Sequence, residues 1–165
     1  MLFEYIKENY KPGEPIFLQD IKIEGMSDAS IRQRMKKLTE TGEIIRYEQG
    51  IYYIPGMYRL KGGVTLAPDT VARYKYISRM GRIMGYYAGY TLANKMGISV
   101  QVPFKEEITS NNIAAIVREV SIGNRVYIVR RAPVEVNEGN HLVLQLLELL
   151  KDIDEYSDDE RNARQ

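Results

Sequence analysis

Basic and amide side chains gather in one short segment, residues 27–41, and these residue types suit contact with a nucleic acid. Arg and Lys can bind phosphate oxygens or guanine edges, Gln can pair with adenine, and small side chains permit close approach. The candidate DNA-binding residues here are Ala29, Ser30, Arg32, Gln33, Lys36 and Lys37. Because Ile31, Met35 and Leu38 recur at helical spacing, the candidates would lie on the outer faces of a helix.

A small hairpin is predicted directly after this helix. Residues 43–47 and 51–54 are rich in β-formers and flank a turn, Glu48-Gln49-Gly50, in which glycine can adopt a positive φ. Counting outward from the turn puts Arg46 and Tyr52 on one face, where they could reach backbone phosphates or the minor groove. The simpler alternative is that the basic helix is only a solvated surface, since surface helices often carry Arg and Lys.

The elements that must hold these residues follow a recognisable order. The sequence predicts a helix over residues 2–10, a strand over 16–18, one or two helical turns over 19–24, a helix from Ser27 or Asp28 to Gly42, and then the hairpin. Helix, strand, helix, helix and hairpin is the order of a winged helix-turn-helix. The predicted fold class is therefore α+β, with a winged helix-turn-helix DNA-binding domain over residues 1–58 and a small α+β domain over residues 59–154.

The second domain opens with a linker over 60–68, marked by Gly62-Gly63, and a predicted helix over 69–84. Lys75, Arg79 and Arg82 would form one stripe of that helix at i, i+4 and i+7. Residues 57–100 hold seven basic side chains and one acidic side chain, although the whole chain has a formal net charge of only +1. The stripe could provide secondary phosphate contacts, or it could be a solvated face.

Further elements follow from the patterning of the remaining sequence. We expect a short helix over 87–96 ended by Gly97, strands over 98–104 and 106–109, a hairpin of 113–122 and 125–131 around Gly123-Asn124, and an apolar helix over 140–153. The leucine face of the last helix would pack on the sheet or on a partner. Residues 155–165 are polar and aperiodic, which indicates a disordered tail.

Composition excludes several classes of protein. The chain has no cysteine, so disulfides, thiolate nucleophiles and zinc–thiolate sites are excluded. The N-terminus lacks the features of a secretory signal, and no apolar run reaches the roughly 18 residues of a membrane span. We therefore expect a cytoplasmic protein without membrane contact.

Residues suited to catalysis are scarce. The lone histidine, His141, opens an apolar helix and is expected to be structural, and no second histidine is present to form a metal site. The sequence predicts no enzyme, no metal and no cofactor. The 13 tyrosines include the clusters Tyr86-Tyr87, Tyr90 and Tyr47, Tyr52-Tyr53. Core packing or a protein interface explains them better than base stacking does.

Three segments carry a resemblance to a known family. GEIIRYEQGIYYIP after a basic helix, GYYAGYTLANKMGISVQVPFKEEITSN at residues 85–111, and VREVSIGNRVYIVRRAP followed by NHLVLQLLELL resemble the AbiEi-type antitoxins of type IV toxin–antitoxin (abortive infection) operons. The resemblance covers about 150 residues through individually loose motifs, and this chain is short for the family.

The resemblance implies a transcriptional autorepressor and antitoxin. It implies an operator with inverted repeats in double-stranded DNA, and a nucleotidyltransferase-like toxin that is opposed without a stable complex. Whether a homodimer binds the operator stays open, as does retention of antitoxin activity in so short a chain. The alternative function is a protein-interaction module whose winged helix docks a protein partner rather than DNA.

Overall fold

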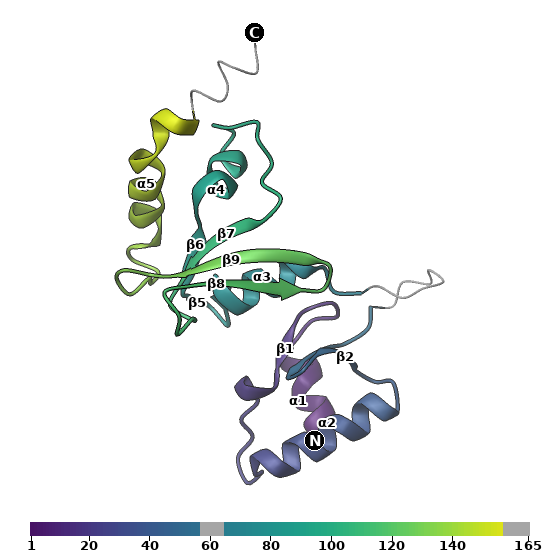
Figure 1. The fold of residues 1–165 in the computed structure, drawn as a ribbon. Helices are drawn as coiled ribbons and strands as arrows, with labels where there is room; N and C mark the ends of the chain where they lie inside the picture. Colours follow the sequence, from purple (N-terminus) through teal and green to yellow (C-terminus); the bar gives the residue numbers. More distant parts are fainter. Residues whose placement is uncertain (57–64, 157–165) are drawn as a thin grey trace. The chain divides into compact units, whose positions relative to one another are not determined.

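The chain forms two compact units, Met1–Thr70 and Val71–Gln165, in a computed structural model that describes residues 1–56 and 65–156 (Figure 1). Helices and strands occur in both units, so the predicted α+β class is confirmed. The predicted linker lies mostly outside the described residues, because residues 57–64 are not among them. Within the described part of the chain, no helix is both long enough and apolar enough to cross a membrane.

The described part of the first unit contains two helices, one 3-10 turn and three short strands. In chain order these are α1 (Leu2–Asn9), β1 (Ile16–Phe17), the 3-10 turn η1 (Leu18–Asp20), α2 (Asp28–Glu40), β2 (Ile45–Glu48) and β3 (Ile51–Tyr53). The first and last of the predicted helices, the strand and the hairpin are therefore present in the predicted order. The helical turns predicted at 19–24 are reduced to η1, and the segment between η1 and α2 is irregular.

The core of the first unit fixes which side of α2 faces outward. The strands form an antiparallel sheet in the order β1-β3-β2. Apolar side chains of both helices and of β1 share one buried cluster: Leu2, Ile6, Tyr10, Ile16, Ile21, Ile31, Met35 and Ile44. Ile31 and Met35 enter this cluster as predicted, and Leu38 packs at its edge.

The capping residues that the sequence indicates at both ends of α2 make their cap contacts in the structure. Ser27 is the N-cap, and its Oγ accepts a hydrogen bond from the Ser30 N–H at 3.2 Å. At the other end Gly42 has a φ of +78°, and the next N–H, of Glu43, donates to the Leu38 carbonyl at 3.0 Å. This is the Schellman arrangement that a positive-φ glycine favours. The outer face of α2 therefore has defined ends.

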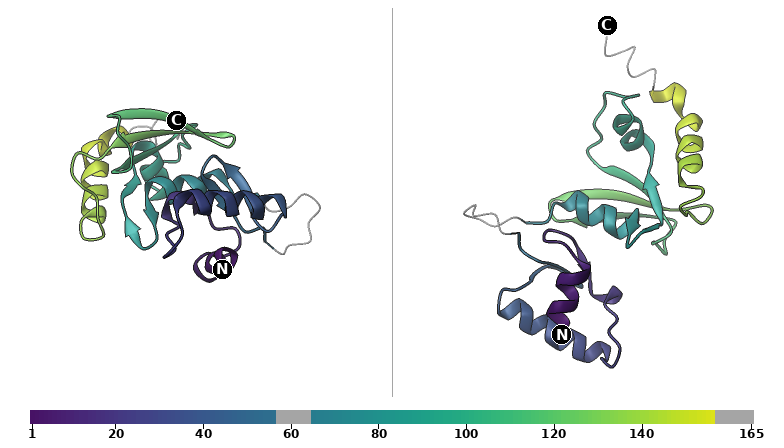
Figure 2. Two further views of the ribbon diagram at one scale, coloured as in Figure 1. Left: turned by 90° about the horizontal axis from the view of Figure 1, so that it is seen from below. Right: turned by 180° about the vertical axis from the view of Figure 1, so that it is seen from behind.

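The second unit is built around a four-stranded sheet. The elements after residue 64 are α3 (Pro68–Tyr76), β4 (Ser78–Arg79), β5 (Arg82–Ile83), β6 (Gly85–Tyr87), α4 (Gly89–Lys95), β7 (Glu106–Ser110), β8 (Val117–Ile122), β9 (Arg125–Arg131) and α5 (His141–Lys151). The sheet has the order β6-β7-β9-β8, in which only the pair β7–β9 is parallel. Helices α4 and α5 lie side by side (Figure 2). The predicted hairpin around Gly123-Asn124 is confirmed as β8–β9.

The predicted helix over 69–84 is wrong beyond Tyr76. After α3 the chain forms the two-stranded hairpin β4–β5 and then enters β6. The hairpin turn is Met80-Gly81, whose φ values are +51° and +74°. Two successive positive φ values match the tight turns that join antiparallel strands, and they cannot occur inside a right-handed helix.

The predicted strand over 98–104 is also wrong. This segment is an irregular loop, and the side chains of Val100, Val102 and Phe104 are 69%, 77% and 92% exposed. The neighbouring strand predicted at 106–109 is confirmed as β7. Apolar and β-branched residues favour a strand locally, but no described strand pairs with this loop.

The end of the described chain is more ordered than the sequence predicts. Tyr156, inside the predicted disordered tail, is 3% exposed and packs edge to face on Tyr90, with ring centroids 4.9 Å apart. The expectation for residues 155 and 156 is therefore corrected, since Tyr156 has an aromatic partner on α4. Residues 157–165 lie outside the described residues.

Candidate nucleic-acid interface

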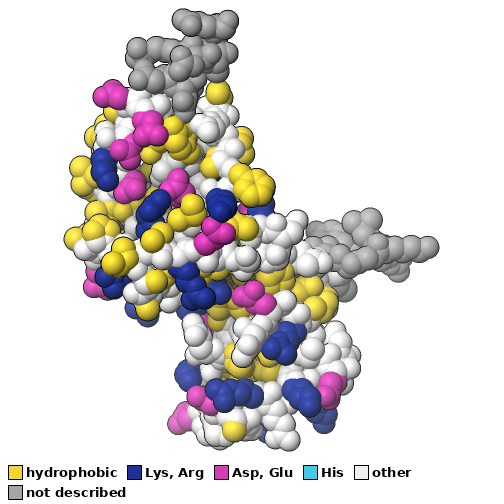
Figure 3. Space-filling model, in the orientation of Figure 1, with side chains coloured by type: hydrophobic (Ala, Val, Ile, Leu, Met, Phe, Trp, Pro, Cys, Tyr) yellow, Lys and Arg dark blue, Asp and Glu magenta, His cyan; other side chains and the backbone are white. Residues whose placement is uncertain are grey.

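The outer face of α2 presents most of the candidate residues to solvent. Ala29, Arg32, Gln33, Lys36 and Lys37 are exposed, and Ser30 is half-buried. The exposed set lies opposite Ile31 and Met35, which are 2% and 0% exposed. Figure 3 shows Lys and Arg side chains over this helix in the lower part of the view. The structure thus brings the six α2 candidates onto one side of one rigid element.

Among the residues that the structure describes, the charged side chains of α2 form only exposed, weak ion pairs. The Lys36 Nζ lies 3.8 Å from an oxygen of Glu40, one turn further along the helix, and both side chains are well exposed. At the start of the helix, Lys22 pairs with Asp28 at 3.2 Å. Exposed pairs of this kind contribute at most about 1 kcal/mol. A polyanion could therefore displace Glu40 from Lys36 at small cost.

The hairpin carries the two remaining candidates. Arg46 pairs directly with Tyr52 across β2 and β3, so both lie on one face of the hairpin as predicted. The register shifts at Tyr47, between Arg46 and Glu48, which is the signature of a β-bulge. Arg46 is exposed, and its Nε donates to the Glu48 carbonyl at 3.4 Å.

Tyr52 is less accessible for contact with DNA than the sequence suggests. Its ring is half-buried against the core cluster of the first unit, so packing fixes much of it. Tyr53 is buried and Tyr47 half-buried beside it. The pKa of Tyr47 is raised, chiefly because burial disfavours the phenolate and secondarily because of the nearby Glu48 charge and Tyr53. The tyrosines of the hairpin therefore serve mainly to pack the sheet.

The predicted basic stripe of Lys75, Arg79 and Arg82 is not a helical stripe. Lys75 lies on α3, whereas Arg79 and Arg82 face each other across the hairpin β4–β5. The turn at Met80-Gly81 interrupts the helix that would have aligned the three side chains. Arg79 and Arg82 still form a pair of neighbouring cations, of which Arg82 is exposed.

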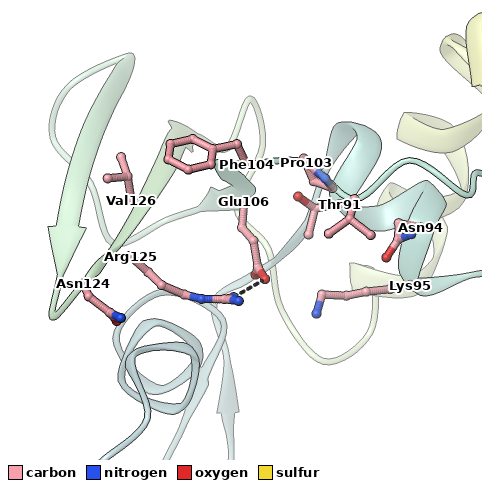
Figure 4. Close-up of a pocket in the computed structure, with 10 residues that line it drawn as sticks. Thr91, Asn94, Lys95, Pro103, Phe104, Glu106, Asn124, Arg125 and Val126 are labelled. Atoms are coloured by element: carbon pink, nitrogen blue, oxygen red, sulfur yellow. Dashed lines mark hydrogen bonds and ion pairs between the residues drawn. The ribbon is translucent and has the colours of Figure 1, made fainter.

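A concave site in the second unit was not predicted. A pocket of about 470 Å³ opens between α4, the loop before β7 and the β8–β9 turn (Figure 4). An ion pair joins Arg125 Nη1 to Glu106 Oε1 at 3.1 Å, and Lys95 points toward it from α4 (Figure 4). The other oxygen of Glu106 is buried without a hydrogen-bond partner among the described residues. Sequence alone could not find this site, because the sheet brings Glu106 and Arg125 together from different strands.

The remaining candidate groups behave as structural residues. The His141 Nδ1 lies 3.1 Å from the Glu138 carbonyl oxygen at the start of α5. Within the described ranges, no group of three or more His, Cys, Asp or Glu residues could hold a metal ion. Tyr86 is buried and Tyr87 and Tyr90 are half-buried, which fits core packing better than base stacking.

The sequence analysis did not predict the ion pair between Lys36 and Glu40, and it left open whether the leucine face of α5 packs on the sheet or on a partner. Glu40 lies four residues after Lys36, and that spacing does predict the observed ion pair. The outward direction of the leucines of α5 carried no such signal, because periodicity shows that a helix has an apolar side without showing what that side meets.

Comparison with known proteins adds one finding to this geometry. No curated protein and no solved structure matches the chain. One sequence-family profile, described as a family of unknown function, matches residues 2–164. Since the match spans nearly the whole sequence, the chain belongs to the family DUF6088.

Proposed function

We propose that the chain is a DNA-binding transcriptional regulator. Its first unit acts as a reduced winged helix-turn-helix, with α2 as the recognition helix and β2–β3 as the wing. The observation that carries this proposal is the two-sided character of α2. Arg32, Gln33 and Lys36 are exposed, while Ile31 and Met35 on the opposite side are held in the core.

The dimensions and chemistry of α2 suit the major groove of duplex DNA. The helix has 13 residues, which corresponds to a length of roughly 20 Å. Exposed Ala29 near the N-terminal end permits the close approach that recognition helices make there. Farther along, Arg and Gln provide the two-point contacts that distinguish guanine and adenine.

The competing function, a protein-docking winged helix, fits this face less well. Protein interfaces are centred on large apolar or aromatic anchors. The exposed candidates of α2 include no large apolar side chain; Ala29 is their one apolar member. The composition of this face therefore favours a phosphate-bearing partner.

We extend the proposal to an autorepressor and antitoxin of a type IV toxin–antitoxin operon. This extension rests on the resemblance of residues 42–55 and 85–111 to the AbiEi-type antitoxins. The operator would contain inverted repeats, and a nucleotidyltransferase-like toxin would be opposed without a stable complex. Arg46 would contact the DNA backbone, and Arg79 and Arg82 would add secondary phosphate contacts.

A promoter reporter tests the regulatory function. The full chain should repress a reporter that is driven by the DNA upstream of its own gene. Arg32→Ala combined with Lys36→Ala should relieve repression without unfolding the chain, because both side chains are exposed. Lys7→Ala combined with Lys11→Ala removes the same charge from another part of the unit and should repress normally. Full repression by the α2 variant would refute the docking proposal.

Growth rescue tests the antitoxin function separately. The full chain should restore growth of cells that express the toxin encoded beside it. The Arg32→Ala/Lys36→Ala variant should rescue equally well if toxin inhibition is independent of repression. Failure of the wild-type chain to rescue would remove the antitoxin assignment and leave the DNA-binding proposal standing.

A further inference from the structure

Helix α5 exposes most of its apolar side chains on one face, and only Leu149 is fully buried against the second unit. Five apolar side chains are more than half exposed: Leu142 at 67%, Val143 at 58%, Leu146 at 52%, Leu147 at 59% and Leu150 at 53%. At about 100° per residue they lie within roughly 140° of the helix circumference and form one continuous stripe. Figure 3 shows hydrophobic side chains along this helix at the left of the view. We call these five residues the α5 stripe.

The opposite side of the helix is partly buried and carries polar as well as apolar side chains. Gln145 and Glu148 are half-buried there, as are Leu144 and the C-cap residue Asp152. The charge of Glu148 helps to raise the pKa of the buried Tyr86 phenol, after burial itself, which places this carboxylate against β6. Leu149 is the one fully buried side chain of α5. Surface helices normally have the reverse arrangement, so the α5 stripe needs a partner.

The size of the α5 stripe supports the same conclusion. Five half-exposed Leu and Val side chains present on the order of 500 Å², which is near the upper limit for the largest apolar patch of a monomer. The adjoining residues 157–165, SDDERNARQ, contain alanine as their only apolar residue. That composition cannot provide an apolar cover.

We propose that the α5 stripe binds the α5 stripe of a second copy of this chain, with the two helices antiparallel. Leu142 and Leu150 lie four residues before and after Leu146, at the middle of the stripe. A twofold axis at Leu146 therefore brings Leu142 of each helix against Leu150 of the other. Closed dimers are built from such self-complementary surfaces.

The helix dipoles select the antiparallel direction. Parallel pairing would place like ends of the two dipoles side by side, whereas antiparallel pairing places opposite ends together. The two stripes would together bury about 1,000 Å², which reaches the lower limit for a specific interface.

The dimer does not depend on the proposed DNA binding. If both hold, one dimer carries two copies of α2, and its twofold symmetry matches that of an inverted repeat. Loss of DNA binding in an α2 variant would leave the dimer intact. Loss of the dimer would weaken binding to an inverted repeat more than binding to a single half-site.

Cysteine cross-linking tests the pairing and its direction. The full chain has no cysteine, so each substitution introduces a unique thiol. Leu146→Cys should form a disulfide-linked dimer under mild oxidation, because facing helices bring residues at the axis within disulfide reach. Leu142→Cys and Leu150→Cys should not cross-link alone, whereas a protein with both substitutions should. Cross-linking of all three single variants would indicate parallel helices and overturn the antiparallel arrangement.

Light scattering on the uncross-linked chain provides the second measurement. At roughly 100 µM, which is high enough to populate a dimer of micromolar affinity, the wild-type chain should have twice the 19.0 kDa chain mass. Leu146→Glu should have the single-chain mass. Val102→Glu, at a side chain that is 77% exposed on another surface, should remain dimeric. A wild-type monomer, or a dimer that survives Leu146→Glu, would overturn the proposal.

Discussion

At the scale of a single residue, Lys36 has an acidic neighbour, Glu40, on the outer face of α2, and under the proposed function its charge would oppose a DNA duplex. Glu40→Gln should remove one negative charge from this face and release Lys36 from its ion pair at 3.8 Å. An exposed pair is worth about 0.2–1 kcal/mol, so affinity for any duplex should rise by about 1.4-fold to fivefold. Fluorescence anisotropy with a labelled duplex measures this change.

The matched control for this prediction removes the same charge elsewhere. Glu8→Gln lies at an exposed position of α1 and should have a smaller effect on affinity. Equal gains from the two variants would show that net charge alone is responsible, and that Glu40 has no special position relative to the DNA.

Met80 is the one described residue other than glycine with a positive φ, +51°, at the turn of the hairpin β4–β5. Left-handed backbone costs a side chain such as methionine roughly 1–2 kcal/mol, whereas asparagine tolerates it and is favoured before glycine in such turns. Met80→Asn should therefore raise the free energy of unfolding by about 0.5–1 kcal/mol. Urea denaturation measures the change.

Met96 offers a control for Met80. The two side chains are 59% and 60% exposed, but Met96 has an ordinary φ of −90°. Met96→Asn should leave stability nearly unchanged. A similar gain from both substitutions would show that removal of an exposed methionine, and not relief of backbone strain, is the cause.

At the scale of elements, the hairpin β2–β3 presents one exposed cation, Arg46, beside the half-buried Tyr52. A residue of a wing is more suited to contact the DNA backbone than the bases, and backbone contacts carry no sequence information. Arg46→Ala should lower affinity for operator and unrelated duplexes by a similar factor. A loss confined to the operator would show instead that Arg46 reads sequence.

The packing of α4 against the end of α5 predicts a pH dependence. Burial, followed by the charges of Asp152, Glu107, Glu148 and Glu155 in that order, raises the pKa of Tyr156 to about 12. Because the folded state favours the neutral phenol, this contribution is complete below pH 10 and is lost as the pH rises toward about 12. Over that range the wild type should lose on the order of 2 kcal/mol more stability than Tyr156→Phe. If urea unfolding showed that the two proteins lose the same stability over this pH range, the prediction would be wrong.

Elements whose signals are local could be predicted from the sequence. The buried stripe of α2, its Ser27 cap and its Gly42 stop all agree, and the structure has the helix where they place it. Glycine turns likewise located the hairpins β2–β3 and β8–β9. Propensity, patterning and turn chemistry favour the same structure at these positions, which is why prediction succeeded there.

Elements decided by tertiary context could not be predicted. Apolar residues between Ile77 and Met84 fit a helical period, but the turn at Met80-Gly81 overrides it. The exposed loop before β7 has the composition of a strand and no described strand to pair with. For the candidate site, the sequence was enough to predict which residues of α2 are exposed. The partial burial of Tyr52 could not be predicted, because it depends on how the core packs against the hairpin.

At the scale of the whole molecule, the two units present surfaces of different chemical character. The first unit presents cations on α2 with no large apolar group among the candidates, and the second presents the uncharged α5 stripe. The first surface is suited to a polyanion and the second to another copy of the chain. Substitutions in α2 should therefore leave the dimer intact, whereas substitutions in the α5 stripe should weaken binding to an inverted repeat more than binding to a single half-site.

The salt dependence of DNA binding tests the central claim, that the outer face of α2 binds duplex DNA, most directly. Association constants of the full chain for a labelled duplex, measured between about 50 and 300 mM salt, should fall linearly on a log–log plot, with a slope of about −0.9 for each phosphate contacted. Arg32→Ala/Lys36→Ala should weaken binding by about 1–3 kcal/mol for a lost base contact and flatten the slope by up to about 1.8. Lys7→Ala/Lys11→Ala should keep the wild-type slope. Binding without salt dependence, or an α2 variant with the affinity and slope of the wild type, would contradict the claim.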